Sequence, residues 1–336
     1  MLKVNIDGEI YYDVDIFSTE MQALLALTHD KSKDITCLCN NDSLPISIVK
    51  GKQHFFLRSY PNTTHKHHTL CKFHALFGDD DTLNKFRVDE KGLIHAKLIL
   101  SEPLSEKKIP TNTNDKKTPT HNNITSSPTG VIAKKSHPEN LTVLLQFLWS
   151  QAFLDTFSYH AKKKTLIDVF KRFYQIITSM RIARKKALDV INVIFPKNDT
   201  IKYYLSTKVD NPLIIGIIDR VELHKKAYKI YFIGMNRPVF MSAKGYEHYV
   251  YQTIDRVDDH YCICVMQVRV VELKNENGQS MFKDIYMAVD DSITISMLNT
   301  LMIPYSSKDE LADIQNLIAE NKNFKKIPKG EIVYSS

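Results

Sequence analysis

The chain has 336 residues, of which 43% are hydrophobic, and a formal net charge of +7 at neutral pH. This length predicts two or three domains. Glycine occurs only ten times, and neither the G-x-G-x-x-G nor the G-x-x-x-x-G-K-[ST] pattern is present, which argues against a glycine-rich phosphate-binding loop. The modest basic excess permits an anionic partner without requiring one.

The compartment is inferred from patterns that the sequence lacks. The first residues do not show the basic, apolar and small-residue progression of a signal peptide. No apolar run is long enough to span a membrane. We therefore expect a cytoplasmic protein whose five cysteines stay reduced and act as thiols or metal ligands rather than as disulfides.

Residues 1–100 are predicted to form a first domain made mainly of strands. Asp7-Gly8 has the composition of a tight turn between two short strands, and Ser18 or Thr19 can cap the helix that follows. Further strands are predicted over 35–39, 46–49, 54–57 and 95–100.

Residues 101–137 are predicted to be a disordered linker. Ser, Thr, Pro, Asn and Lys dominate there, so the segment cannot bury enough apolar surface to offset its ordering entropy. Residues 138–196 are then predicted to be a basic helical segment. Its apolar residues recur at helical spacing, which indicates three helices, over 139–152, 166–177 and from Ala187 to near Pro196.

Residues 197–336 are predicted to form a mixed sheet with helices. Strands over 213–218 and 228–233 flank a turn at Lys225-Lys226, and a hairpin crosses Asn277-Gly278. Helices are predicted over 242–253 and 307–318. The fold class is therefore α+β.

Two cysteine and histidine clusters predict a zinc site in the first domain. Alternate residues of a strand share a face, so Cys37 and Cys39 can point together, and the 46–57 hairpin returns the chain to His68 and Cys71. Three thiolates and one imidazole form a closed, structural set, which predicts a zinc-ribbon-like domain. His68 is chosen over the nearby histidines for its two-residue spacing to Cys71. The alternative is that the cysteines are small core residues and the histidines form a solvated turn.

A dense basic run lies in the predicted helices and suits contacts with nucleic-acid phosphates. The alternative is a solvated face that keeps a small helical domain soluble. The candidate nucleic-acid-binding residues are Lys162, Lys163, Lys164, Lys171, Arg172, Arg181, Arg184, Lys185 and Lys186.

An enzymatic alternative rests on Glu272 and Lys274, which form a Glu-x-Lys pair at a strand end. In metal-dependent nucleases, carboxylates hold Mg²⁺ while a lysine orients the attacking water, and Asp219 is a candidate second carboxylate. Because a polar strand end entering a turn has the same composition, we assign no catalytic residue. The second Cys-x-Cys pair, Cys262 and Cys264, lies in an apolar run and is predicted to be core.

Several stretches resemble, in order, the domain-of-unknown-function family 1173. They are Cys37-Leu38-Cys39, Leu44-Pro45-Ile46, the histidines through Cys71, Leu144 to Trp149, and Ile303 to Ser307. The resemblance implies an uncharacterised bacterial protein of plasmids and integrative conjugative elements, without an established activity. It also implies that longer members continue past the region matching Phe324 to Pro328, which gives no support to an enzymatic role for this chain.

We therefore expect a zinc-containing, nucleic-acid-associated binding protein of a mobile element. The alternatives are a metal-dependent or degenerate nuclease and a protein–protein adaptor in a conjugation system. No membrane partner is expected.

Overall fold

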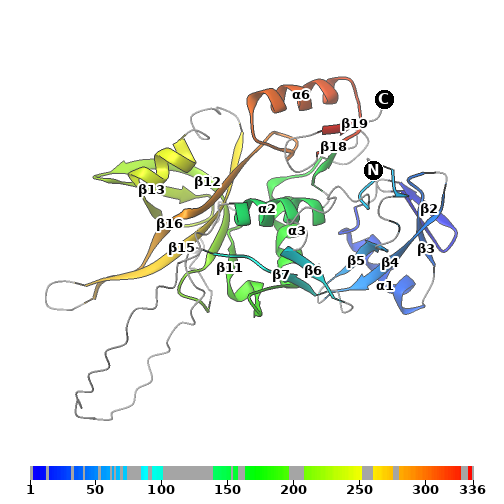
Figure 1. The fold of residues 1–336 in the computed structure, drawn as a ribbon, viewed down its shortest axis with the longest axis horizontal. Coiled ribbons are helices and arrows are strands. Elements are labelled where there is room, and N and C mark those ends of the chain that lie inside the picture. Colours follow the sequence, from blue (N-terminus) through cyan, green and yellow to red (C-terminus); the bar gives the residue numbers. More distant parts are fainter. Residues whose placement is uncertain are drawn as a thin grey trace, which may run out of the picture.

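The structure is a computed structural model (Figure 1). Within the residues that it describes, the chain is a mixed α+β protein with four sheets and few helices, which confirms the predicted class. In Figure 1 an N-terminal sheet and a C-terminal barrel lie on opposite sides of two central helices. The described residues are 3–12, 15–31, 34–40, 42–51, 54–60, 63, 66–68, 71–73, 85–89, 93–100, 139–152, 154–157, 163–196, 208–251, 260–274, 280–326 and 332–334. The predicted linker, 101–137, lies outside them.

The N-terminal sheet is antiparallel, in the order β2-β1-β3-β4-β5. Asp7 and Gly8 form the predicted turn with φ values of 54° and 91°, the left-handed conformation that such two-residue turns need. Helix α1 (Thr19–Asp30) begins at Ser18, whose hydroxyl accepts the Met21 N–H. The strands are β1 (Lys3–Ile6), β2 (Glu9–Tyr12), β3 (Ile35–Cys37), β4 (Leu44–Lys50) and β5 (Phe55–Ser59).

The central part combines two helices with a small sheet. Helices α2 (Glu139–Gln151) and α3 (Leu166–Thr178) occupy the predicted positions. The sheet has the order β10-β9-β7-β6, with β7 and β9 parallel, so strands from before and after residues 101–137 pair directly. Its strands are β6 (Phe86–Val88), β7 (Ile94–Ala96), β9 (Met180–Ile182) and β10 (Lys185–Lys186).

The predicted third helix is wrong. A 3-10 turn, η3 (Ala187–Asp189), is followed by strand β11 (Ile191–Val193), which runs parallel to β12 (Leu213–His224). All three residues of β11 are buried. Strands buried on both faces have continuous apolar sequences that lack the two-residue alternation, so a short apolar run does not distinguish such a strand from a helix.

Five C-terminal strands close into a barrel in the order β12-β13-β14-β16-β15, and β15 pairs back onto β12. All neighbours are antiparallel except β14 and β16. A short helix, α4 (Ala243–Gly245), and a π-helical turn, η4 (Tyr246–Tyr251), connect β14 to the segment before β15, where a helix was predicted. The strands are β12 (Leu213–His224), β13 (Ala227–Phe232), β14 (Val239–Ser242), β15 (Tyr261–Lys274) and β16 (Ser280–Leu298).

The remaining elements tie the C-terminal end to the centre. Helix α6 (Lys308–Ala319) follows β17 (Pro304–Tyr305), which pairs with β16. Strand β18 (Phe324–Lys326) pairs with β8 (Thr156–Phe157) and β19 (Ile332–Tyr334). No helix in the described part of the chain has both the length and the apolar character needed to cross a membrane.

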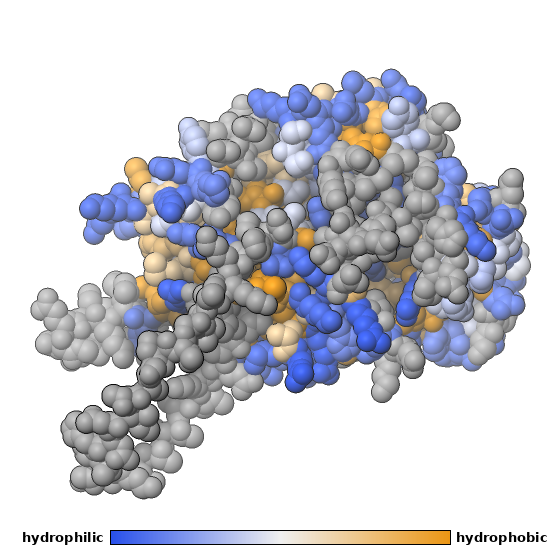
Figure 2. Space-filling view, viewed as in Figure 1, coloured by the Kyte–Doolittle hydropathy of each residue, from blue (hydrophilic) through white to orange (hydrophobic). Residues whose placement is uncertain are grey.

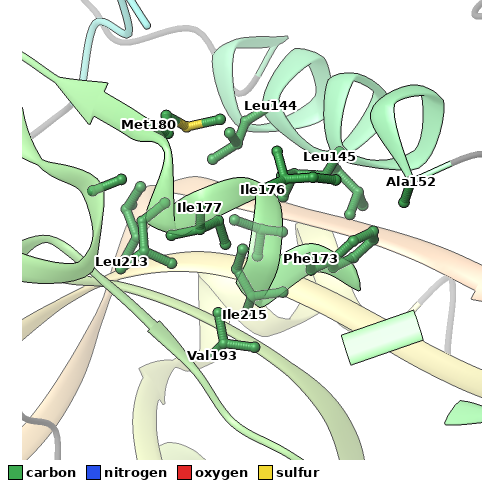
Figure 3. Close-up of a cluster of buried hydrophobic side chains, with 14 of the residues drawn as sticks. Leu144, Leu145, Ala152, Phe173, Ile176, Ile177, Met180, Val193, Leu213 and Ile215 are labelled. Atoms are coloured by element: carbon green, nitrogen blue, oxygen red, sulfur yellow. The ribbon is translucent and has the colours of Figure 1, made fainter. Parts of the chain in front are cut away.

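Two hydrophobic cores meet at the first half of β12. Leu213, Ile215 and Ile217 pack with α2 and α3 in the central core, part of which Figure 3 shows. Ile214 and Ile218 point to the other face, into the barrel interior. Because alternate residues enter different cores, this half strand is buried on both faces and fixes the barrel against the central helices.

Because the barrel interior is tightly packed around Gly216, we expect Gly216→Ala to destabilise the protein. A Cβ on Gly216 would lie 2.7 Å from Cδ1 of the Phe232 ring, so the free energy of unfolding should fall by about 1–3 kcal/mol in urea denaturation. Adding Phe232→Leu, which removes the ring, should cost less than the two single changes combined. Equal stability of Gly216→Ala and the parent, or strict additivity, would contradict this packing.

Candidate metal centre and basic face

Four side chains at one end of the N-terminal sheet come together as a candidate metal centre. Cys37 ends β3, and Cys39, two residues later, directs its thiol to the same point. The β4–β5 hairpin then separates these cysteines from His67 and Cys71. This is the arrangement that the sequence predicts, in which a hairpin returns the second pair of ligands to the first.

The distances suit one tetrahedral ion. The Sγ atoms of Cys37 and Cys71 are 3.5 Å apart, and Nδ1 of His67 lies 3.3 Å from Sγ of Cys39 and 3.6 Å from Sγ of Cys71. All four ligand atoms lie within 4.8 Å of one another. Metal–sulfur bonds of about 2.3 Å in a tetrahedron put sulfurs about 3.8 Å apart. The four residues can therefore hold a metal ion with little rearrangement.

The histidine of this cluster is His67, which corrects the predicted His68. His67 is 3% exposed and its ring packs against Phe73. His68 is exposed, but its backbone N–H donates to Sγ of Cys39 at 3.3 Å. The spacing rule therefore predicted the correct turn beside the thiols but selected His68 in place of its neighbour His67. His65 and His74 lie outside the described residues.

The thiols of the cluster differ in pKa. Hydrogen bonds from Cys37, Cys71 and the His68 N–H lower the pKa of Cys39. Hydrogen bonding to Cys39 and Cys71, together with burial, raises the pKa of Cys37. Metal binding requires all three as thiolates, and the N–H of Phe73 provides a further donor, to Sγ of Cys71, at 3.4 Å.

A buried lysine connects this centre to the C-terminal end. Lys325 on β18 is 0% exposed and its Nζ donates to the carbonyl oxygen of Cys71 at 2.7 Å. Lys72, the residue after Cys71, places its Nζ 3.3 Å from the hydroxyl of Ser150 in α2. Burial lowers the pKa of Lys325. The turn that carries Cys71 is thus fixed from two directions.

The predicted basic residues do not form one set. Arg172 is buried, donates to the carbonyl of Ala152 at 2.9 Å and pairs with Asp15. It therefore joins α3 to the segment before α1, which corrects its assignment as a phosphate contact. Burial lowers the pKa of the half-buried Lys164 to about 8. Lys163 and Lys171 are exposed, and Lys162 lies outside the described residues.

The other predicted cations lie on a hairpin rather than on a helix. Arg184 is in its turn, Lys185 and Lys186 are in β10, and Arg181 is in β9. Lys185 pairs with the buried Ile182, whereas Lys186 pairs with Arg181. Lys186 and Arg181 therefore belong to the face of the sheet that is turned away from the core.

Strand pairing extends this pair into a row of four basic residues, which we call the basic face. Arg181 pairs with His95 on β7, and His95 pairs with Arg87 on β6. Alternating residues of the same strands, such as Ile94 and Ile182, pack in the central core. Asp89 bonds to Nε2 of His95 at 3.0 Å. The sequence did not indicate Arg87 and His95, because each is isolated in the chain and only the sheet register brings them to Arg181.

The nuclease residues are not brought together. Ile218 pairs with Cys262 and Leu213 with Gln267, so Asp219 and Glu272 lie toward opposite ends of the β12–β15 pairing. Asp219 instead forms an ion pair with Arg220 at 2.8 Å. The side chain of Lys274 lies outside the described residues. Cys262 and Cys264 are buried in the barrel interior, as predicted.

The two histidines can be separated by substitution. His67→Ala should weaken metal affinity by more than about 100-fold, beyond the usual effect of losing an outer-shell partner, because a ligand is removed. His68→Ala should retain the metal, since the bond from His68 to Sγ of Cys39 comes from its backbone N–H. Elemental analysis after dialysis against a competing chelator measures both. Metal retained by His67→Ala but lost from His68→Ala would contradict the geometry of the candidate metal centre.

No curated protein and no solved structure matches this chain. The family model described as "Protein of unknown function (DUF1173)" matches residues 11–196, which is more than half of the chain. The match contains the four candidate metal ligands and the basic face, whereas Ile303 to Ser307 and the barrel lie outside it. The chain therefore belongs to the DUF1173 family.

Proposed function

We propose that this protein is a cytoplasmic, zinc-stabilised protein that associates with nucleic acid. The observation that carries the proposal is the basic face, the cross-strand row Lys186–Arg181–His95–Arg87. Neighbouring strands lie about 4.8 Å apart, so this row presents several cations at a spacing comparable to that of backbone phosphates. A mobile-element setting, which the family resemblance implies, is compatible with such a role.

Arg181 lies at the centre of the row, between Lys186 and His95. Arginine binds phosphate in a bidentate manner through its planar guanidinium. The row thus has both the charge and a suitable donor group for an anionic chain.

Zinc is the metal that the donor set favours. Three thiolates and an imidazole are soft ligands in a closed set of four, so no position remains open for a reacting water. Such a centre in a small zinc-ribbon-like unit contributes folding free energy on the order of 10 kcal/mol. The requirement for reduced thiols supports the cytoplasmic assignment.

Chelation should therefore destabilise the protein. We expect one zinc ion per chain, lost in Cys37→Ser, and a melting temperature that falls when the purified protein is stripped of metal. Cys264→Ala removes a thiol from the barrel core and should retain zinc, which makes it the matched control. Thermal unfolding and elemental analysis test this. Equal melting with and without metal would rule out a structural zinc.

The basic face predicts salt-dependent binding to nucleic acid. Changing Arg87, Arg181 and Lys186 together to Gln should weaken binding and reduce the slope of log K against log salt by about 2–3, near one per lost phosphate contact. Fluorescence anisotropy with a labelled DNA strand at several salt concentrations measures the slope. Lys308→Gln, an exposed lysine at the start of α6, should leave it unchanged. Absence of binding by the parent protein would refute the function.

A further inference from the structure

We propose that the outer face of β13 and β14 in the C-terminal barrel binds single-stranded nucleic acid by stacking its bases on aromatic side chains. The inference rests on the proposed association with nucleic acid but assigns a second, separate surface. We call this surface the aromatic face and define it by Arg220, His224, Lys229, Tyr231, Phe240, Met287 and Arg269.

Only half of the barrel's outer surface is available. The first half of β12, the start of β15 and the end of β16 face α2 and α3, where Ile215, Ile263 and Leu298 join the central core. The second half of β12, together with β13 and β14, carries no such cover among the described residues. In Figure 2 hydrophobic residues reach the surface over the barrel, at the left, and are bordered by hydrophilic ones.

The strand register aligns one row across the open half. Lys229 pairs with Phe240, and Phe240 pairs with Met287. At the two ends, Lys229 pairs with Glu222 and Met287 with Arg269. Alternate residues such as Ile230 and Met241 fill the barrel interior, so the row lies on the outside. Met287 is 44% exposed, so this end of the row presents an apolar side chain to solvent.

Phe240 is the centre of this row. Lys229 Nζ lies 5.8 Å from the centroid of the Phe240 ring, and the His224 ring lies 6.3 Å from it. An aromatic ring beside a lysine offers a base its π-surface, and the lysine ammonium offers the adjoining phosphate an opposite charge. Base–aromatic stacking accepts every base because each has a π-face.

A second stacking position lies one row away. The Arg220 guanidinium sits over the Tyr231 ring at 3.9 Å, and Arg220 and Tyr231 are register partners. Glu222 accepts hydrogen bonds from both, at 2.9 Å from Nε of Arg220 and 3.0 Å from the Tyr231 hydroxyl. These bonds orient the planar guanidinium so that its outer side can stack with a base.

The charges around the face favour an anionic ligand. Among the described residues, Asp219 and Glu222 lie here and are both bonded to Arg220, while Asp290 accepts a hydrogen bond from the Ser242 hydroxyl at the end of β14. The turn between β12 and β13 adds Lys225 and Lys226, both exposed. Lys229 and Arg269 then complete a set of cations that exceeds the carboxylates, so a strand of phosphates is a complementary occupant.

The barrel's connectivity supports the same occupant. A five-stranded closed barrel in which the third and fifth strands are parallel, with a helical segment between the third and fourth strands, has the topology of the OB fold. In that fold, oligonucleotides bind across the second and third strands and the adjacent loops, which correspond here to β13, β14 and the Lys225-Lys226 turn. A fold alone does not define a ligand; Phe240, Tyr231 and the cations beside them favour the nucleic acid.

Single strands are favoured over duplexes by geometry. Bases in a duplex are stacked on one another and are not available to Phe240, whereas the bases of a single strand can turn toward the sheet. The aromatic face should therefore bind oligo-dT more tightly than a duplex of equal length, and the binding should weaken with salt.

The test is fluorescence anisotropy of the full chain with a labelled oligo-dT strand of about 16 nucleotides, the upper site size for one barrel of this type. Phe240→Leu should weaken binding by about tenfold or more, while Phe240→Tyr, which keeps an aromatic ring, should bind nearly as the parent does. Tyr261→Ala, an exposed aromatic residue on the covered side of the barrel, should have no effect. Circular dichroism confirms that each variant is folded.

The outcomes separate the two proposals. One outcome is that Phe240→Leu binds oligo-dT as tightly as the parent while the Gln variant of the basic face loses binding. That result would overturn the aromatic face and leave the proposed function intact. Tighter binding to duplex than to oligo-dT would also overturn it. No binding to any nucleic acid by the parent would overturn both. Loss of oligo-dT binding in Phe240→Leu, with binding retained in Phe240→Tyr, supports base stacking.

Discussion

Strand β12 is hydrogen-bonded along both edges and, in its first half, buried on both faces. It pairs with β15 on one edge and with β11 and then β13 on the other. Because Ile214 and Ile215 enter different cores, β12 is where the barrel and the central helices are joined. Its second half leaves the core, and the outward residues from Asp219 onward become surface. The same strand therefore determines which side of the barrel is covered and which is open to a ligand.

A second connection joins the two ends of the chain. Lys325 on β18 bonds to the carbonyl of Cys71, and Lys326 forms an ion pair with Glu310 at 2.6 Å. A metal ion held by three thiolates carries a net negative charge, which the nearby lysines would offset. The candidate metal centre is thus part of the interface between the N-terminal sheet and the C-terminal strands, so a role confined to stapling the first residues is too narrow.

Local features were predictable from the sequence and long-range ones were not. The Asp7-Gly8 turn, the Ser18 cap and the β12–β13 hairpin follow from nearby residues. The candidate metal ligands were placed to within one residue, because Cys37 and Cys39 lie two residues apart at the end of β3, whereas a turn leaves His67 and His68 undistinguished.

The basic and aromatic faces depend on register. Arg87 and Arg181 are far apart in sequence, and Phe240 is unremarkable until its neighbours are known. Spacing along a chain does not reveal partners across a sheet, since pairing is set by non-local packing. The burial of Arg172 was equally hidden, because its partner Asp15 belongs to another part of the chain.

Ultraviolet crosslinking of the full chain to oligo-dT, with the crosslinked peptides identified by mass spectrometry, locates nucleic acid on the barrel's open half or elsewhere. Crosslinks concentrated in the peptides that carry Tyr231 and Phe240 are the expected result. Crosslinks confined to β6, β7, β9 and β10 would contradict the aromatic face and leave the basic face as the nucleic-acid site, and no crosslinks at all would contradict both.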